Sequence, residues 1–340
     1  MAHAGPMDVV PFVVSVAPAE LDELRRRVRA TRWPDPETGS GWTQGVPLET
    51  MRELARYWAD EYDWRRLERR LAGLDQLRAR VDGLDVDLVH ARSPRPDATP
   101  LVLTHGWPGS LPRVPRRARP PHAPARRRAR LPRRGPLAAG LRVERPADDA
   151  GLHLTPPLVD PDLTVGDRTE AERADLAVRE AGAEGSAYSA VHATHPQTLG
   201  YGLSDSPVGL AAWIVEKVAA RSDHDGDLFA VLSRAQALDD VTLYWLTGTA
   251  ASSTRLYAES IRTVERWMTT PPRPEEVVRV PVGAAVFRDN PRPSRRWAER
   301  RYADIRYWGT PERGGHFAAW EQPEIYVREL RASFRAILAD

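Results

Sequence analysis

The chain has 340 residues, of which 41% are hydrophobic and 28% charged, which is the composition of a folded protein rather than a disordered one. It contains no cysteine, which excludes disulfides, thiolate catalysis and cysteine-based metal sites. The net charge of +2 gives no reason to expect nucleic acid or a membrane as partner. No apolar span or secretory signal is visible, so we expect a cytoplasmic protein.

The first hundred residues predict helices followed by a hairpin. Apolar residues spaced three and four apart predict helices over 17–32, 48–60 and 63–71. Alternating hydrophobic residues on both sides of Asp82-Gly83 predict two paired strands. The apolar stretch 100–104 then predicts a strand that leads directly into the turn His105-Gly106-Trp107-Pro108. A strand that ends in a glycine-containing turn is where open α/β sheets place their sites.

The segment 113–134 interrupts this pattern. It holds ten arginines and five prolines but no acidic residue, and no helix or strand period survives in it. One explanation is a frame-shifted and shortened segment, because out-of-frame GC-rich coding reads as Arg, Pro, Ala and Gly. The other is a genuine basic insertion that binds nucleic acid or a membrane surface. We favour the first, because the segment replaces core that the rest of the chain requires.

Regular patterns return in the second half of the chain. Residues 151–154, 276–287 and 305–308 predict strands. Helices are predicted over 170–180, 205–220, 228–257, 260–268 and 323–338. In the second of these helices Ser206 is the expected N-cap and Pro207 lies in the first turn.

Two loops near the C-terminus carry the best candidates for acid–base chemistry. His316 follows a predicted strand, lies in a Gly-Gly turn and precedes a helix, as a catalytic base of an α/β sheet does. Asp289 lies 27 positions earlier, just after another predicted strand, and is suited to orient that base. The alternative is that His316 is a structural loop residue and Asp289 a turn residue.

Other candidates are weaker when taken alone. The backbone N–H groups of the turn at Trp107 are suited to an oxyanion hole. Tyr188 and Tyr257 lie in predicted helical sequence, where a phenol can donate a proton to a developing oxyanion. A plain turn and packing tyrosines are the competing interpretations. The histidines at 105, 153, 192 and 195 have no metal-ligand spacing, so we expect no metal.

Together these stretches resemble the microsomal-type epoxide hydrolases. The matching segments are THGWPGS (104–110), LSDSPVGLAAWIVEK (203–217), YWLTGTAASSTRLY (244–257) and RGGHFAAWEQPE (313–324). RWPD (32–35) and YDWRRLERRL (62–71) are similar to the N-terminal domain of that family. The resemblance covers nearly the whole chain except about 111–150.

The resemblance implies an α/β fold of the α/β-hydrolase type with a helical lid and an N-terminal helix and hairpin domain. The implied divisions are an N-terminal domain over 1–97, a first part of the core over 98–158, a lid over 159–271 and a C-terminal part of the core over 272–340. The core is expected to be incomplete around 111–150.

The resemblance also implies a two-step reaction. An aspartate attacks an epoxide carbon to form an alkyl-enzyme ester, and a histidine-activated water hydrolyses that ester. His316 matches the base, Asp289 the acid that orients it, Tyr257 the principal proton donor, Tyr188 the second tyrosine and Trp107 the oxyanion turn. The implied partner is a small-molecule epoxide, without cofactor, metal, nucleic acid or membrane, and a homodimer is the assembly to test.

One required feature is missing from the sequence. Family members carry the nucleophile in a Gly-Gly-Asp-Trp-Gly elbow between the HGWP turn and the strand matched by GLHL (151–154). This chain has no such motif, and neither Asp205 nor the aspartates of 223–227 substitute for it, so the nucleophile is unknown. Two hypotheses follow, an active epoxide hydrolase and a catalytically inactive homologue. We also expect 113–134 to lack regular structure, and the Asp289 carboxylate and the Tyr257 hydroxyl to face the same cavity as His316.

Overall fold

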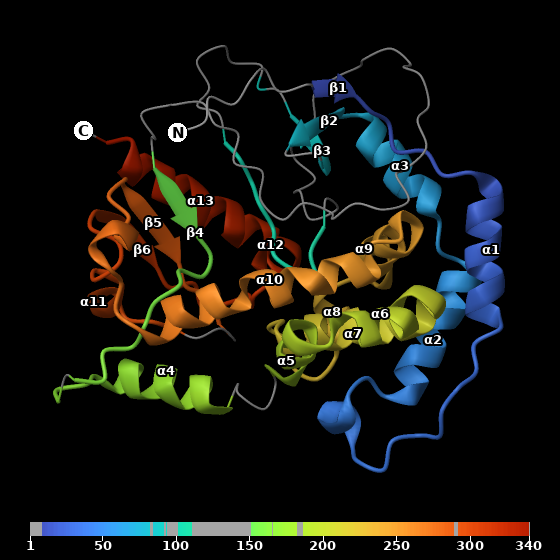
Figure 1. Cartoon of the computed structure of the whole chain (residues 1–340), viewed down its shortest axis with the longest axis horizontal. Coiled ribbons are helices and arrows are strands. Elements are labelled where there is room, and N and C mark those ends of the chain that lie inside the picture. The colour runs from blue at the N-terminus through green and yellow to red at the C-terminus, as the bar shows by residue number, and fades with distance from the viewer. Residues whose placement is uncertain are drawn as a thin grey trace. The chain divides into compact units, whose positions relative to one another are not determined.

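A computed structural model describes residues 9–81, 84–91, 93, 101–110, 151–164, 166–181, 186–288 and 292–339 (Figure 1). The chain divides into two compact units. The first combines Met1–Val143, Pro196–Lys217 and Leu232–Arg255, and the second combines Glu144–His195, Val218–Val231 and Leu256–Asp340. The segment 113–134 and Asp289 lie outside the described residues. The expectations for both, and the domain boundaries, therefore remain predictions.

Three helices open the first unit, as the spacing of apolar residues predicts. They are α1 (Pro18–Arg29), α2 (Leu48–Asp60) and α3 (Trp64–Ala72), with the short 3₁₀ helix η1 (Gly41–Gln44) between the first two. Helix α1 has Pro18 in its first turn and arginines in its last, which suits the helix dipole. Asp63 caps α3, because its side chain accepts a hydrogen bond from the Arg65 N–H at 2.9 Å.

The predicted hairpin is confirmed as part of an antiparallel sheet. Its strands are β1 (Val9–Pro11), β2 (Asp75–Val81) and β3 (Leu84–His90), in the order β1-β2-β3. Arg78 stands opposite Asp87 in the register, and the two side chains form an ion pair at 2.7 Å. The Arg78 guanidinium also lies 4.0 Å from the centre of the Phe12 ring. This cross-strand pair helps to fix the register.

The helices between residues 196 and 269 differ in detail from prediction. Helix α6 (Pro196–Asp205) was not predicted, and α7 (Pro207–Ala220) begins at its expected cap, where Ser206 Oγ accepts from the Gly209 N–H at 2.9 Å. The helical pattern predicted over 228–257 is confirmed, but it forms separate helices, α8 (Leu228–Val231), α9 (Arg234–Thr247) and α10 (Ala250–Thr269). The last of these continues without a break through the helix predicted over 260–268. Ser233 caps α9 at one end and left-handed Gly248 (φ +65°) ends it at the other.

The strand predicted over 100–104 is also wrong in the residues described. Leu101, Val102 and Leu103 have irregular backbone and are 48%, 54% and 46% exposed. An apolar run becomes a strand only where another strand pairs with it, and the local sequence pattern does not encode that partner. The end of this segment is nevertheless held in place, because the Tyr244 hydroxyl donates to the Gly109 carbonyl at 2.9 Å.

The second unit contains a parallel sheet. Its strands are β4 (Leu152–Leu154), β5 (Val282–Ala285) and β6 (Ile305–Gly309), in the order β4-β5-β6. The strand predicted over 276–287 is shorter than expected, because its start is the 3₁₀ helix η4 (Pro274–Glu276) and Pro281, which lacks an N–H, precedes β5. All four residues of β5 are buried, as expected for a central parallel strand.

The helices of the second unit are α4 (Glu170–Ala181), α5 (Ala187–Thr194), α11 (Arg295–Ala298), α12 (Ala318–Glu321) and α13 (Pro323–Ile337), together with α8 and most of α10. Helix α13 runs alongside the three strands (Figure 1) and approaches so closely that a Cβ at Gly283 would clash with Ser333. Trp297 of α11 packs into a separate cluster with Val282 and Ile305. Within the described residues, no helix has the length and apolarity needed to cross a membrane.

Candidate active site

His316 lies in a turn between β6 and α12, where the sequence predicts it. Gly314 has φ +101°, and a Cβ at Gly315 would lie 2.5 Å from the Arg221 carbonyl oxygen, so the Gly-Gly pair is required by backbone conformation and space. The His316 N–H donates to that same carbonyl at 2.8 Å. The exposed His316 ring stands edge-on to Phe317, with 5.0 Å between the ring centroids. The turn therefore presents an imidazole on a firmly held backbone.

Two carboxylates that the sequence analysis did not assign hold this turn. Glu321, which is 7% exposed, accepts N–H groups of Asp223 at 2.6 Å, Gly315 at 2.8 Å and Phe317 at 2.9 Å. The Asp223 carboxylate accepts the Gly314 N–H at 2.8 Å. Burial raises the pKa of Glu321, which the three N–H groups oppose and the nearby Asp223 carboxylate reinforces. No local motif marks the contacts made through Asp223, because Asp223 is 98 residues from Glu321 and 91 from Gly314.

The structure brings Tyr188 and Tyr257 together. Tyr188 lies on α5 and Tyr257 on α10, and their hydroxyl oxygens are 3.4 Å apart. The ring centroids are 5.8 Å apart at an interplanar angle of 71°. Both side chains are half-buried. Two phenols that meet at their hydroxyl ends can both donate hydrogen bonds to one acceptor oxygen.

A buried histidine completes this group. His192 is fully buried on α5, four residues after Tyr188 and therefore on the same helix face. Its ring centroid lies 5.5 Å from that of Tyr188 and 4.8 Å from that of Tyr257, and both contacts are edge-to-face. In the sequence, the spacing of His192 from the other histidines is informative only about metal binding, which it does not support. The four-residue spacing from Tyr188 is the signal that could have found it.

Trp107 lies in the first unit, in a turn closed by the Gly109 N–H, which donates to the Gly106 carbonyl at 2.7 Å. Ser110, which follows, is 1% exposed and donates to the Asp240 carboxylate of α9. The oxyanion-hole role of this turn remains a prediction. Asp289 lies outside the described residues, so its pairing with His316 also remains a prediction. Among the described residues, no cluster of three or more His, Asp or Glu is arranged to hold a metal ion.

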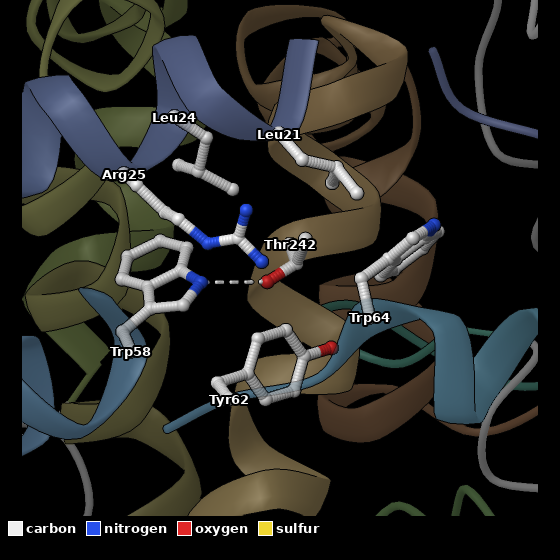
Figure 2. Close-up of a pocket in the computed structure, with 7 residues that line it drawn as sticks. All are labelled: Leu21, Leu24, Arg25, Trp58, Tyr62, Trp64 and Thr242. Atoms are coloured by element: carbon white, nitrogen blue, oxygen red, sulfur yellow. Dashed lines mark hydrogen bonds between the residues drawn. The ribbon is translucent and has the colours of Figure 1, made fainter. Parts of the chain in front are cut away.

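The first unit also contains a pocket, shown in Figure 2, that holds none of the predicted site residues. It is lined by Leu21, Leu24, Arg25, Trp58, Tyr62, Trp64 and Thr242. The Trp58 Nε1–H donates to Thr242 Oγ1 at 3.0 Å across it (Figure 2), and the Tyr62 hydroxyl donates to the buried Asp239 carboxylate at 2.8 Å. Burial raises the pKa of both Tyr62 and Asp239. These bonds tie the N-terminal helices to α9, which is a structural role.

Comparison with known proteins gives the class of the fold. The chain matches an Aspergillus niger structure titled "Structure of enantioselective mutant of epoxide hydrolase from Aspergillus niger generated by directed evolution" with a TM-score of 0.76 and 26% identity, over 96% of this chain and 95% of that one. The juvenile hormone epoxide hydrolase of Bombyx mori matches with a TM-score of 0.74 and 22% identity, over 98% and 96% of the two chains. The chain therefore has the α/β-hydrolase fold.

Sequence comparison gives the family. Residues 9–114 match the family model "Epoxide hydrolase N terminus". A Stigmatella aurantiaca protein named "Putative epoxide hydrolase" is 38% identical, over 97% of this chain and 86% of its own length, and "Epoxide hydrolase 1" of Oryctolagus cuniculus is 26% identical, over 94% and 87%. The chain belongs to the epoxide hydrolase family.

Proposed function

We propose that this protein acts on a small epoxide, which is held through its oxygen by Tyr188 and Tyr257 and converted with water to a vicinal diol. The observation that carries the proposal is the 3.4 Å distance between the two phenol oxygens, which come from residues 69 positions apart. Such a pair stabilises the negative charge that develops on the epoxide oxygen as its carbon–oxygen bond breaks.

The proposed chemistry has two steps. A carboxylate oxygen attacks one epoxide carbon, the carbon–oxygen bond breaks, and a tyrosine protonates the leaving oxygen, which gives an alkyl-enzyme ester. His316 then removes a proton from a water molecule, which attacks the ester carbonyl and releases the diol and the free carboxylate. Asp289 is the proposed orienting acid for His316, and the turn at Trp107 is the proposed oxyanion hole for the ester. A cytoplasmic role in detoxification or aromatic hydrocarbon catabolism remains a prediction.

The absent elbow favours a second candidate, a catalytically inactive homologue that binds epoxides. No Gly-Gly-Asp-Trp-Gly motif stands in the sequence. The alignment with the Stigmatella relative is 385 residues long, whereas this chain has 340, so the relative carries segments without a counterpart here. This second candidate predicts no alkyl-enzyme ester from the chain as it stands, and epoxide hydrolysis barely above background, because the first step lacks its nucleophile.

The test is to incubate the purified chain with styrene oxide, quantify the diol, and search for a mass increase on the protein. Tyr257→Phe, Tyr188→Phe and His316→Ala are the informative variants, and His195→Ala is the control, because His195 is exposed at the end of α5. Turnover that His316→Ala abolishes would favour the active enzyme and would mean that an aspartate elsewhere in the chain is the nucleophile. Background turnover with styrene oxide binding that depends on the tyrosines would favour the inactive homologue. Binding and turnover that ignore both tyrosines would overturn both candidates.

A further inference from the structure

His192 packs beside the tyrosine pair, and it has no role in the reaction proposed above. His192 is 0% exposed, and a titratable ring that is fully buried beside two phenols is an uncommon choice for mere packing. It presents its ring to both tyrosines at 88° and 81°, which is the edge-to-face geometry that aromatic rings prefer. The three rings form one cluster that joins α5 to α10.

We infer that His192 is a positioning residue, whose buried ring packs against both tyrosines and holds their hydroxyls close enough to bind one epoxide oxygen together. This inference rests on the proposed function of the tyrosine pair. The ring contacts set the orientation of each phenol, and through it the position of each hydroxyl.

The geometry explains why a ring is needed at this position. Tyr188 and His192 are fixed relative to each other by the helix that carries both, whereas Tyr257 comes from a different helix. The contact at 4.8 Å between the rings of His192 and Tyr257 is the shortest of the three, so it is the one that places the second phenol beside the first. An aliphatic side chain at 192 lacks the flat ring that this edge-to-face contact needs, so it would hold the Tyr257 ring less firmly.

The experiment compares two ligands that differ by a single oxygen, styrene oxide and styrene. Their affinities are measured by calorimetry for the full chain and for His192→Phe, His192→Leu and His192→Met. His195→Leu is the matched control, because it makes the same kind of change on an exposed histidine three residues away. Tyr257→Phe and Tyr188→Phe report separately on the tyrosine pair. If styrene oxide is turned over, KM from initial rates replaces the dissociation constant, and kcat is compared alongside it.

We expect His192→Leu and His192→Met to weaken styrene oxide binding about three- to tenfold, the size of one lost hydrogen bond, and to leave styrene binding unchanged. His192→Phe should retain most of the affinity, because the ring edge remains. Equal loss for both ligands would mean that His192 only maintains the fold, and would overturn the inference. Unchanged styrene oxide binding in the His192 variants, with weaker binding in the tyrosine variants, would overturn the inference but keep the proposed function. If neither tyrosine variant affects styrene oxide, the proposed function itself fails.

Discussion

The turn that carries His316 and the segment Leu101–Ser110 both have glycine-containing sequences that resemble family motifs. Both form the predicted turn, but the strand predicted before the second turn is missing from residues 101–104. Four backbone N–H groups of the His316 turn and its neighbours are accepted by Glu321 and Asp223, and the His316 N–H by the Arg221 carbonyl. Within the segment Leu101–Ser110, Leu101–Thr104 has irregular backbone and exposed apolar side chains, whereas Gly109 and Ser110 are bonded to α9. A turn can be fixed by a few side chains, whereas a strand needs neighbouring strands.

On the explanation that the Arg/Pro-rich segment replaces core of the family, the difference shows which parts of the fold are lost with that core. The predicted strand at 101–104 would then lack the strands that should follow it along the chain and pair with it. The sheet of the second unit uses strands from 152–154 and beyond 282, and it forms in their presence. A change confined to 111–150 can therefore remove a strand and a nucleophile while the base and the tyrosine pair persist.

Replacing 111–150 with an in-frame family segment that carries the Gly-Gly-Asp-Trp-Gly elbow should give the largest effect. We expect epoxide hydrolysis to rise by up to about 10⁶-fold, the typical contribution of a nucleophile that acts as a unit with its base. Diol formation from styrene oxide measures it, and the gain should disappear in His316→Ala. Hydrogen exchange at 101–104 should slow at the same time, because the strand gains partners.

The outcome that would contradict this account is robust hydrolysis by the chain as it stands. It would mean that one of the aspartates present attacks the epoxide, and mass spectrometry of the trapped ester would identify it. If the restored segment gives activity but hydrogen exchange at 101–104 is not slower, activity requires the nucleophile and does not require a strand at 101–104.

The second test disturbs the turn that carries His316. Glu321→Leu removes the acceptor of three backbone N–H groups and leaves them buried without partners, so we expect the free energy of unfolding to fall by at least about 3 kcal/mol. Chemical denaturation measures the loss. Glu324→Leu, a few residues along and exposed, is the control and should change stability little. Equal stability of the two variants would mean that Glu321 does not hold the turn.

The third test uses pH to probe the sheet of the second unit. Burial lowers the pKa of His153 on β4 to about 4, and the Glu329 carboxylate opposes this only partly. The unfolded chain takes up the His153 proton below pH of about 6.5 and the folded one only near 4, so the free energy of unfolding should fall as pH drops between these values. The loss should reach about 3 kcal/mol at most. His153→Leu should flatten this part of the pH profile. A variant with the same slope as the unchanged chain would mean that the His153 ring is hydrated in the folded protein.

The sequence predicted those parts of the fold and site that depend on local pattern. Helix α2 spans the predicted 48–60, Asp63 and Ser206 cap the expected helices, and the turn of His316 lies where expected. The tyrosines were assigned through resemblance, and their 3.4 Å approach joins residues 69 apart, which no local period encodes. The division of 228–257 into three helices had a local signal in Ser233 and Gly248 that the apolar pattern concealed.

The remaining misses have one physical origin. The bonds from the Asp223 N–H to Glu321 and from the Gly314 N–H to Asp223 join distant parts of the chain, and a lone carboxylate in sequence does not reveal which backbone groups donate to it. The strand predicted at 101–104 is wrong because strand formation also depends on distant parts of the chain. Its residues have the right composition, but the outcome depends on partners elsewhere in the chain.

The smallest expected effect comes from one valine substitution in each of two apolar runs. It measures directly how far the burial of such a run depends on pairing partners. Val102 is 54% exposed and Val282, in the centre of β5, is 0% exposed, although both belong to apolar runs that predict strands. Val→Thr keeps the shape and adds a hydroxyl, so Val282→Thr should lower the free energy of unfolding by about 2 kcal/mol, because the hydroxyl is buried without an assured partner. Val102→Thr should change it by less than about 0.5 kcal/mol, because water satisfies the hydroxyl. Urea denaturation of the two variants makes the comparison. A loss at Val102 as large as at Val282 would show that the 101–104 segment is buried in solution. In a chain with the elbow segment restored, we expect Val102→Thr to lower the free energy of unfolding as much as Val282→Thr does.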